Sequence, residues 1–205
     1  MSRRVLSLAL CCVLLPSLAL AGTIVEKKSK QEFPDVIEVD NGGETSTLRA
    51  TGAALRKKIF WKVYAAVGYI DQTVELGEDP GAAIVAAEAP KQIHLRMLRD
   101  VDSEKITNGI NEALEKCAVV PYDDIADERA QFLNVFGDEK LMKGDDLRML
   151  YRPGMGLEVS VNGEIRGVIE GEGFGSSFFA IYFGDPPVDK GLKKKLLSAV
   201  MPEDD

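Results

Sequence analysis

The sequence predicts an α+β protein with an antiparallel sheet, folded as a single domain. Strand-like and helix-like runs follow one another in mixed order, which is typical of this class. Asn162-Gly163 stands between two alternating runs and indicates a tight type I′ hairpin, which joins antiparallel neighbours. No internal repeat or low-complexity linker divides the chain, so we expect one domain over residues 22–205.

The first 21 residues have the parts of a secretory signal peptide. Arg3 and Arg4 precede an apolar run over residues 5–20, and Ala19-Leu20-Ala21 forms an A-x-A cleavage site. The run is shorter than the ~20 residues that cross a bilayer, so we expect no stable membrane anchor after cleavage. Cleavage after Ala21 would give a periplasmic or secreted protein. The general and the twin-arginine export routes both stay open.

The mature chain would be acidic and would hold a single cysteine. Cleavage removes two arginines and no acidic residue, so the net charge moves from −8 to −10. Such a charge disfavours nucleic acid as a partner. Cys117 follows Ile106, Ile110 and Leu114 at helical spacing, which predicts a buried, inert thiol and no internal disulfide.

The first half of the chain contains three predicted strands. They cover residues 36–39, 46–55 and 59–70, and Arg56-Lys57-Lys58 is expected to connect the last two. Both faces of the third run are largely apolar, which predicts a central strand covered on each side. On this basis Trp61 and Tyr69 should lie in the core or in the wall of a cleft.

The remaining elements alternate between helix and strand. We expect helices over residues 81–89, 103–117, 123–136 and 174–183, and a terminal helix with Leu192, Leu196, Ala199 and Val200 on its inner face. Strands are expected over residues 92–98, 146–152, 157–161 and 164–169.

Arg56 and Tyr64 are the candidate ligand-binding residues. A cation and a phenol within an apolar run are costly to bury without a partner, and an apolar carboxylic acid would supply one. The alternatives are an Arg56 side chain in water at the rim of a hairpin and a core Tyr64 bonded to the backbone.

The chain resembles the chalcone isomerase-like family, in its bacterial secreted branch, over residues 46–200. The resemblance rests on residues 55–70 (LRKKIFWKVYAAVGYI), on residues 144–157 (GDDLRMLYRPGMGL) and on residues 178–188 (FFAIYFGDPPV). It implies a long, curved antiparallel sheet with a layer of helices on one face and a ligand cleft between them.

The resemblance also implies roles for single residues. Arg56 matches the arginine that the family retains, and Tyr64 matches the tyrosine that holds the carboxylate, together with that arginine, in fatty-acid-binding members. Asp102 and Gly109 stand where the isomerases have a catalytic tyrosine and asparagine, so chalcone isomerase activity is not expected.

Three functions follow from these observations. The leading hypothesis is a non-catalytic periplasmic protein that binds a fatty acid or a similar amphipathic carboxylate. The second is an isomerase or lyase acting on a phenolic or carbonyl substrate in the same cleft. The third is an envelope interaction protein with a vestigial cleft and an unknown protein partner. We expect no catalytic residues, cofactor or metal site, because His94 is the only histidine and has no second ligand at metal spacing.

Overall fold

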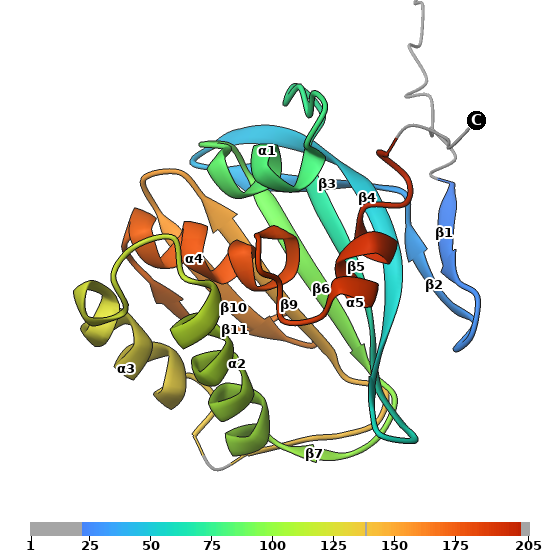
Figure 1. Ribbon diagram of the computed structural model, residues 1–205, viewed down its shortest axis with the longest axis vertical. Helices are drawn as coiled ribbons and strands as arrows, with labels where there is room; N and C mark the ends of the chain where they lie inside the picture. Colours follow the sequence, from blue (N-terminus) through green and yellow to red (C-terminus); the bar gives the residue numbers. More distant parts are fainter. Residues whose placement is uncertain (1–21, 138, 202–205) are drawn as a thin grey trace, which may run out of the picture.

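The computed structural model describes residues 22–137 and 139–201, so the predicted signal peptide lies outside the described part of the chain. Its centre is a curled, antiparallel seven-stranded sheet with the strand order β11-β10-β9-β6-β5-β4-β3, and helices cover one of its faces (Figure 1). This arrangement confirms the predicted fold class. The seven strands are β3 (Val36–Asn41), β4 (Glu44–Lys58), β5 (Trp61–Asp71), β6 (Lys91–Met97), β9 (Asp146–Arg152), β10 (Gly156–Val161) and β11 (Glu164–Ile169).

The helical layer is formed by five α-helices and one short 3₁₀ helix. They are α1 (Pro80–Ala86), α2 (Ser103–Cys117), η1 (Tyr122–Ile125), α3 (Ala126–Asn134), α4 (Glu172–Phe183) and α5 (Lys190–Leu196). Within the described residues, no helix is both long enough and apolar enough to cross a membrane.

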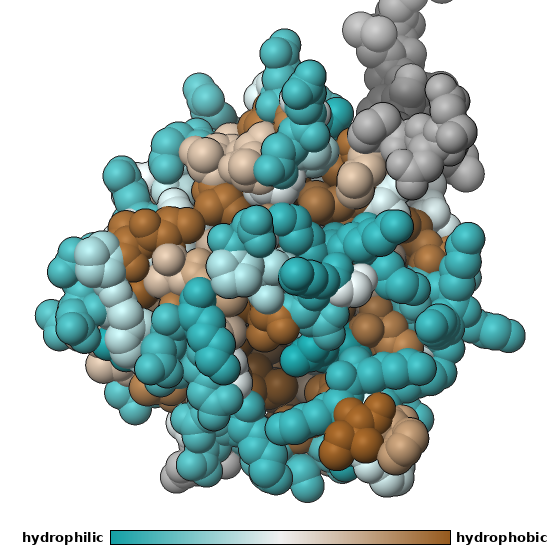
Figure 2. All heavy atoms as spheres, in the orientation of Figure 1, coloured by the Kyte–Doolittle hydropathy of each residue, from teal (hydrophilic) through white to brown (hydrophobic). Residues whose placement is uncertain are grey.

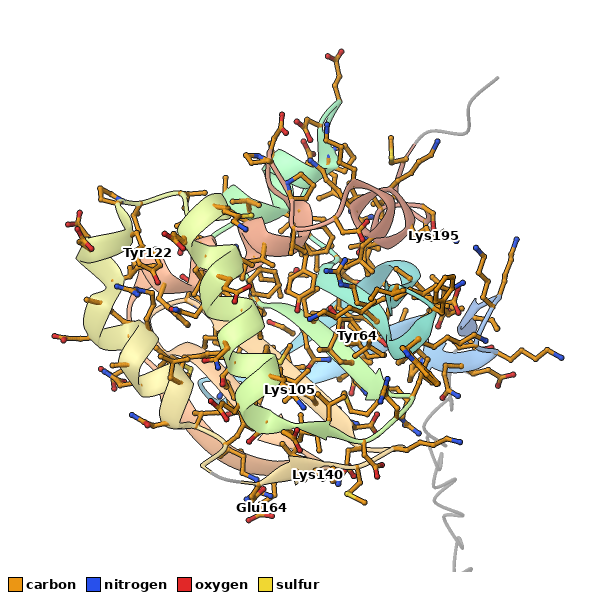
Figure 3. The ribbon with its side chains drawn as sticks, turned by 60° about the horizontal axis from the view of Figure 1, so that its bottom comes forward. Tyr64, Lys105, Tyr122, Lys140, Glu164 and Lys195 are labelled. Carbon is orange, nitrogen blue, oxygen red and sulfur yellow. The ribbon has the colours of Figure 1, made fainter. Side chains whose placement is uncertain are left out.

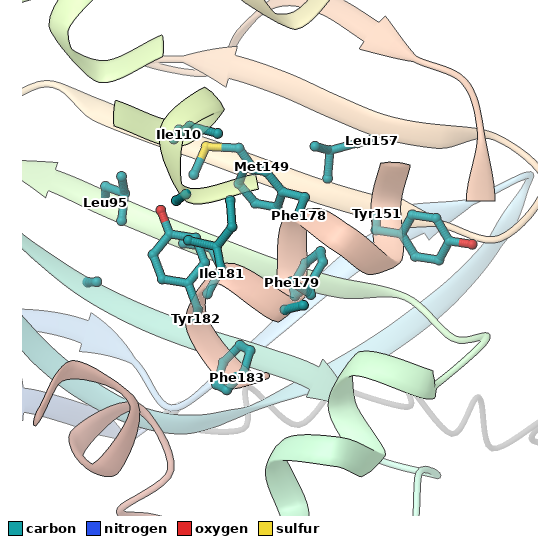
Figure 4. Close-up of a cluster of buried hydrophobic side chains, with 14 of the residues drawn as sticks. Leu95, Ile110, Met149, Tyr151, Leu157, Phe178, Phe179, Ile181, Tyr182 and Phe183 are labelled. Atoms are coloured by element: carbon teal, nitrogen blue, oxygen red, sulfur yellow. The ribbon is translucent and has the colours of Figure 1, made fainter. Parts of the chain in front are cut away.

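The main core lies between the sheet and α4. Phe178, Phe179 and Phe183 of α4 are fully buried there, and Figure 4 shows them in one cluster with Met149 and Leu157 of the sheet. An α-helix that is apolar on all sides is stable only when it is enclosed. The sheet on one side and the other helices around it therefore fix the position of α4.

The opposite face of the sheet is covered by a small hairpin that the sequence pattern does not predict. Its strands are β1 (Thr23–Glu26) and β2 (Gln31–Pro34). Phe33 is buried against Leu48 and Tyr69, and the Tyr69 hydroxyl donates a hydrogen bond to the Pro34 carbonyl at 2.8 Å. Each strand has only four residues and Phe33 is its one fully apolar buried anchor, so no periodic pattern indicates the hairpin.

The β4–β5 hairpin departs from the predicted boundaries. Strand β4 continues through Lys58, so Arg56 belongs to the strand and the connection is the two-residue turn Ile59–Phe60. Tyr69 is buried as expected, but the Trp61 side chain is 65% exposed, so its predicted place in the core or cleft wall is wrong. Alternation gives the faces of a strand correctly, but it does not show that the end of the hairpin extends beyond the covering layers.

The other differences are local. The predicted 123–136 helix is divided into η1 and α3, and α5 ends at Leu196, so that Ala199 and Val200 lie in the turn that follows. A short pair of strands, β7 (Val101–Asp102) and β8 (Lys140–Leu141), was not anticipated. The remaining predicted strands and helices agree with the structure to within a few residues.

Candidate functional site

A cavity of about 510 Å³ lies between the sheet, α2 and the segment that joins α4 to α5. Figure 2 shows a hollow with hydrophobic walls between α2 and α5, near the end of the sheet where β4 and β5 turn. The cavity is lined by Arg56, Lys58, Val63, Tyr64, Leu95, Lys105, Ile106, Gly109, Ile110, Glu112, Ala113, Lys116, Cys117, Ile181, Tyr182, Pro186, Pro187 and Val188.

Both predicted ligand-binding residues lie on the wall of this cavity. Arg56 of β4 and Tyr64 of β5 are directly opposite one another in the strand register, so their side chains share the face of the sheet that the helices cover. Tyr64 is seen at the sheet, with Lys105 on the neighbouring α2 (Figure 3). Burial raises the pKa of the Tyr64 hydroxyl, and the positive charge of Arg56 only partly offsets the effect, so Tyr64 is a neutral hydrogen-bonding group.

The guanidinium of Arg56 already has a carboxylate partner. Its Nη1 lies 2.5 Å from Oδ2 of Asp189, and the two side chains are 29% and 38% exposed. Oδ1 of Asp189 accepts a hydrogen bond from the Leu192 amide at 2.9 Å and so caps the N-terminus of α5. No local pattern indicates this role of Asp189, because 133 residues separate it from Arg56.

Tyr182 is a buried phenol in the cavity wall, and the sequence pattern does not predict it as a site residue. Burial raises the pKa of the Tyr182 hydroxyl well above its ordinary value, and the neighbouring Tyr64 raises that pKa further. Its hydroxyl points toward Leu95 and Ile110, which also line the cavity (Figure 4). The apolar run of α4 conceals Tyr182, since a tyrosine among phenylalanines in a sequence has the pattern of a core residue.

The charge of the cavity is opposite to that of the chain as a whole. Its lining includes four cationic side chains and one carboxylate, Glu112, although the net charge of the protein is −8. The cations are Arg56, Lys58, Lys105 and Lys116. Most of the other lining side chains are aliphatic or aromatic. An apolar space with cations around it favours an amphipathic anion.

Of the two positions that depart from the isomerase pattern, one lines the cavity and the other does not. Gly109 lines the cavity, and a Cβ atom added to it would meet no heavy atom within 4 Å. Asp102 is exposed and pairs with Lys105 at 2.6 Å, and it does not line the cavity.

Cys117 lines the cavity at the end of α2 as a free, buried thiol whose pKa is raised by burial. The predicted burial of Cys117 is thus confirmed.

His94 belongs to a separate cluster next to β2. Its Nε2 lies 2.6 Å from Oδ1 of Asp146, and its ring packs edge-on against Phe33. Burial alone would raise the pKa of Asp146, but hydrogen bonds from His94 and Arg96 outweigh it and hold that pKa below the ordinary value. In residues 22–137 and 139–201, no group of three or more histidine, cysteine or acidic side chains is arranged to hold a metal ion.

A second hollow, of about 650 Å³, lies beside α1 and α5. Its lining includes three carboxylates and three lysines. They are Glu78, Asp79, Asp185, Lys190, Lys193 and Lys194. This balance of charges selects no particular sign of ligand, so the first cavity is the better candidate.

Comparisons with known proteins agree with this arrangement. A family model described as chalcone isomerase-like matches residues 26–198. Among solved structures, a fatty-acid-binding protein of Arabidopsis thaliana is similar with a TM-score of 0.68 and 21% sequence identity, over 87% of this chain and 97% of that one. No curated protein matches the sequence significantly. At this level of identity the structural likeness shows the shared fold.

Proposed function

Because this chain belongs to the chalcone isomerase-like family, we propose that it is a non-catalytic binding protein for a fatty acid or a similar amphipathic carboxylate. We further propose that it acts in the periplasm or is secreted, on the basis of the N-terminal pattern that ends at Ala21. The name of the similar plant protein states that it binds fatty acids, which supports the same ligand class.

The proposal depends on one observation: Arg56 and Tyr64 lie opposite one another on the wall of an otherwise largely apolar cavity. A guanidinium and a neutral phenol can both donate hydrogen bonds to one carboxylate. The apolar side chains of the sheet, α2 and α4 would enclose the hydrocarbon tail. A volume of about 510 Å³ is within the usual range of roughly 300–1,000 Å³ for small-molecule sites.

The ion pair with Asp189 is compatible with ligand binding. A guanidinium has five N–H donors, and the contact with Asp189 is made through Nη1. The remaining donors can bind a ligand carboxylate while Asp189 holds the side chain in place. Asp189 would also weaken the attraction of Arg56 for an anion, since it already compensates the positive charge.

The two alternative functions have less support. An isomerase or lyase needs a polar group that stabilises a developing charge, and Gly109 supplies none at the position where the isomerases have asparagine. A vestigial cleft would be closed and would leave Arg56 in solvent. The open volume and the partly buried Arg56 side chain favour a working pocket over that function.

The test is native mass spectrometry of protein purified without removal of lipids, followed by titration with long-chain fatty acids. We expect bound carboxylic acids, and a loss of affinity of about tenfold or more in Arg56→Ala, since a charge-assisted hydrogen bond contributes ~1.5–3 kcal/mol. Tyr64→Phe should weaken binding less, because a neutral hydroxyl contributes about half as much.

Arg166→Ala is the matched control. Arg166 also forms an ion pair, with Glu139 at 2.9 Å, and it does not line the cavity. Unchanged affinity in Arg56→Ala, or an equal loss in Arg166→Ala, would contradict the proposed site. Turnover of an enolisable substrate that disappears in Arg56→Ala would favour the enzyme instead.

A further inference from the structure

The β4–β5 hairpin ends in three exposed hydrophobic residues. Ile59, Phe60 and Trp61 are 81%, 91% and 65% exposed, the highest values among the large hydrophobic residues in the described part of the chain. Figure 2 shows an apolar protrusion at the end of this hairpin, surrounded by hydrophilic atoms. Scattered apolar residues are common on protein surfaces, but three consecutive ones at the tip of a hairpin require an explanation.

The turn itself does not require these residues. Ile59 has a φ of 57°, in the left-handed region that a β-branched side chain rarely adopts. Glycine or asparagine would be favoured at this position of a two-residue hairpin. The sequence therefore places an isoleucine at the exposed tip of the hairpin in spite of an unfavourable backbone conformation.

Basic residues surround the apolar tip. Lys57 and Lys62 are directly opposite in the register, where like charges repel, and Lys58 is the last residue of β4. The guanidinium of Arg99 lies over the Trp61 ring, 5.1 Å from its centroid. Among residues 22–137 and 139–201, no carboxylate lies within ion-pair distance of these four cations. Residues 56–70 contain no acidic residue at all.

We propose that this tip, Ile59–Trp61 with Lys57, Lys58, Lys62 and Arg99, is a docking surface for an anionic lipid bilayer. Aromatic and aliphatic side chains enter the boundary between headgroups and acyl chains, while nearby lysines and arginines bind anionic headgroups. Tryptophan in particular favours this boundary. The contact would be peripheral and reversible, because three side chains bury little apolar area and the tip belongs to a folded hairpin.

A second copy of the chain is a poorer occupant of this surface. The Lys62 Nζ donates a hydrogen bond to the Lys28 carbonyl at 2.6 Å, and within the described residues neither Lys57 nor Lys62 has a carboxylate partner. Tip-to-tip contact would bring these two positive charges of one copy against those of another. A bilayer with anionic headgroups satisfies both properties of the surface, its apolar tip and its positive charge. In a bilayer the acyl chains lie directly beneath the charged headgroups, so the apolar tip and the basic residues around it could each meet the layer that suits them.

The location of the tip relative to the cavity gives docking a consequence. Lys58 is part of the docking surface and also lines the cavity, and Arg56 and Tyr64 follow within the same two strands. A docked molecule would therefore hold the cavity close to the membrane, so that an amphipathic ligand crosses little water. Only this last step rests on the proposed function, since docking does not depend on what the cavity holds.

Trp61 allows docking to be measured directly, because it is the only tryptophan of the chain. Its fluorescence should shift to shorter wavelength with vesicles of equimolar phosphatidylcholine and phosphatidylglycerol, and brominated acyl chains should quench it. Vesicles of phosphatidylcholine alone should give a much weaker effect. High salt should weaken binding to the anionic vesicles.

Two variants that retain Trp61 test the tip. Ile59→Asn with Phe60→Ser should weaken vesicle binding at least tenfold, and asparagine suits the left-handed turn, so folding is preserved. Lys57→Glu with Lys62→Glu should weaken it further, since each basic residue at an anionic surface contributes about fivefold. Ile165→Ser and Lys140→Glu are the matched controls, because both residues are exposed and distant in sequence from the tip.

The outcomes separate docking from ligand binding. Vesicle binding that fails at low salt, or that is equal in the tip and control variants, overturns the docking surface. Concentration-dependent dimers that disappear in the tip variant, without vesicle binding, would show that a second copy covers it. If the tip variant loses vesicle binding but Arg56→Ala binds fatty acids normally, docking stands and the proposed ligand site is wrong.

Discussion

Asp189 holds Arg56 and caps α5 with the same carboxylate, through its two different oxygens. One candidate ligand residue is thereby tied to the last helix of the described chain. Helix α5 in turn rests on β4, where the Thr51 hydroxyl donates to the Leu196 carbonyl at 2.7 Å. At Gly52, a Cβ atom would lie 2.7 Å from the same carbonyl oxygen, so only glycine permits this approach. The head-group end of the cavity is consequently braced by the C-terminal helix.

Asp189→Asn should increase the affinity for fatty acids severalfold, because it leaves Arg56 without a compensating charge. Asparagine can still cap α5, and the ion pair is partly exposed, so stability should change by less than ~1 kcal/mol. Asp189→Ala should additionally lose the cap, at about 1 kcal/mol. Isothermal titration of both variants with one fatty acid, alongside chemical denaturation, checks this prediction. Weaker binding in Asp189→Asn would show that Asp189 positions Arg56 more than it neutralises it.

Gly109→Leu should reduce ligand capacity without destabilising the protein. The new side chain would enter the cavity, where an added Cβ atom meets no heavy atom within 4 Å. Leucine also favours a helix over glycine by about 0.8 kcal/mol, so the midpoint of unfolding should stay the same or rise. Displacement of a fluorescent fatty acid measures the first effect and thermal unfolding measures the second. Unchanged binding of long-chain acids would place the ligand elsewhere.

Phe33→Ala should destabilise the protein by roughly 3 kcal/mol and leave fatty-acid affinity unchanged. Phe33 is buried between the β1–β2 hairpin and the sheet, on the face opposite the cavity, and a large cavity would replace its ring. Denaturant unfolding measures the loss of stability. Val25→Ala, on the exposed side of β1, is the control and should cost much less.

The free energy of unfolding should increase as the pH rises from about 8 toward 10, because the buried Lys91 loses its proton in this range. Burial lowers the pKa of this lysine from 10.5 to about 8, although its Nζ donates to the carbonyls of Ile84, Val85 and Ala87, each at 2.9 Å. In this window the unfolded chain binds the proton more tightly than the folded protein does. The free energy of unfolding therefore increases with pH, by up to about 1.4 kcal/mol per unit.

Lys91→Met is the control for this pH dependence, since it removes the titrating group. Above about pH 10 the buried tyrosines act in the opposite direction, because their folded-state pKa values are raised and unfolding allows them to ionise. The difference between wild type and Lys91→Met, measured by urea unfolding from pH 7.5 to about 9.5, isolates the lysine. A difference that is flat across this range would contradict the lowered pKa.

Much of the fold was predictable because its elements have strong local patterns. The sequence predicts the helix of residues 103–117 and the strand of residues 146–152 with their observed boundaries, since periodicity and flanking residues both indicate them. The β1–β2 hairpin has no recognisable pattern, because its strands are short and Phe33 is their one fully buried apolar side chain. The prediction for Trp61 is wrong because apolar residues are buried only on average. The tip of the β4–β5 hairpin extends beyond the layers that cover the sheet, so its apolar side chains are exposed.

The candidate site was predictable in part for a similar reason. Arg56 and Tyr64 stand out because a charge and a hydroxyl interrupt an apolar strand, and the structure places both on one cavity wall. Asp189 and Tyr182 could not be found in this way. Asp189 has the ordinary pattern of a helix cap, and Tyr182 has the pattern of a core aromatic residue. Their relation to Arg56 and Tyr64 arises only when distant segments pack together.

One hairpin, β4–β5, carries the two candidate head-group residues near its end and the exposed apolar tip just beyond them. Side chains alternate between the two faces of a regular strand, so a regular extension of the hairpin, without a further bulge, adds whole pairs of residues if both ends are to keep their orientation. An added pair in each strand would move the tip outward by about 7 Å and leave the cavity wall intact. A single added residue would turn the tip over unless a bulge absorbed it, as one does between Arg56 and Lys57. The length of this hairpin is therefore a discrete variable, set in steps, that fixes how far the pocket stands from whatever the tip touches.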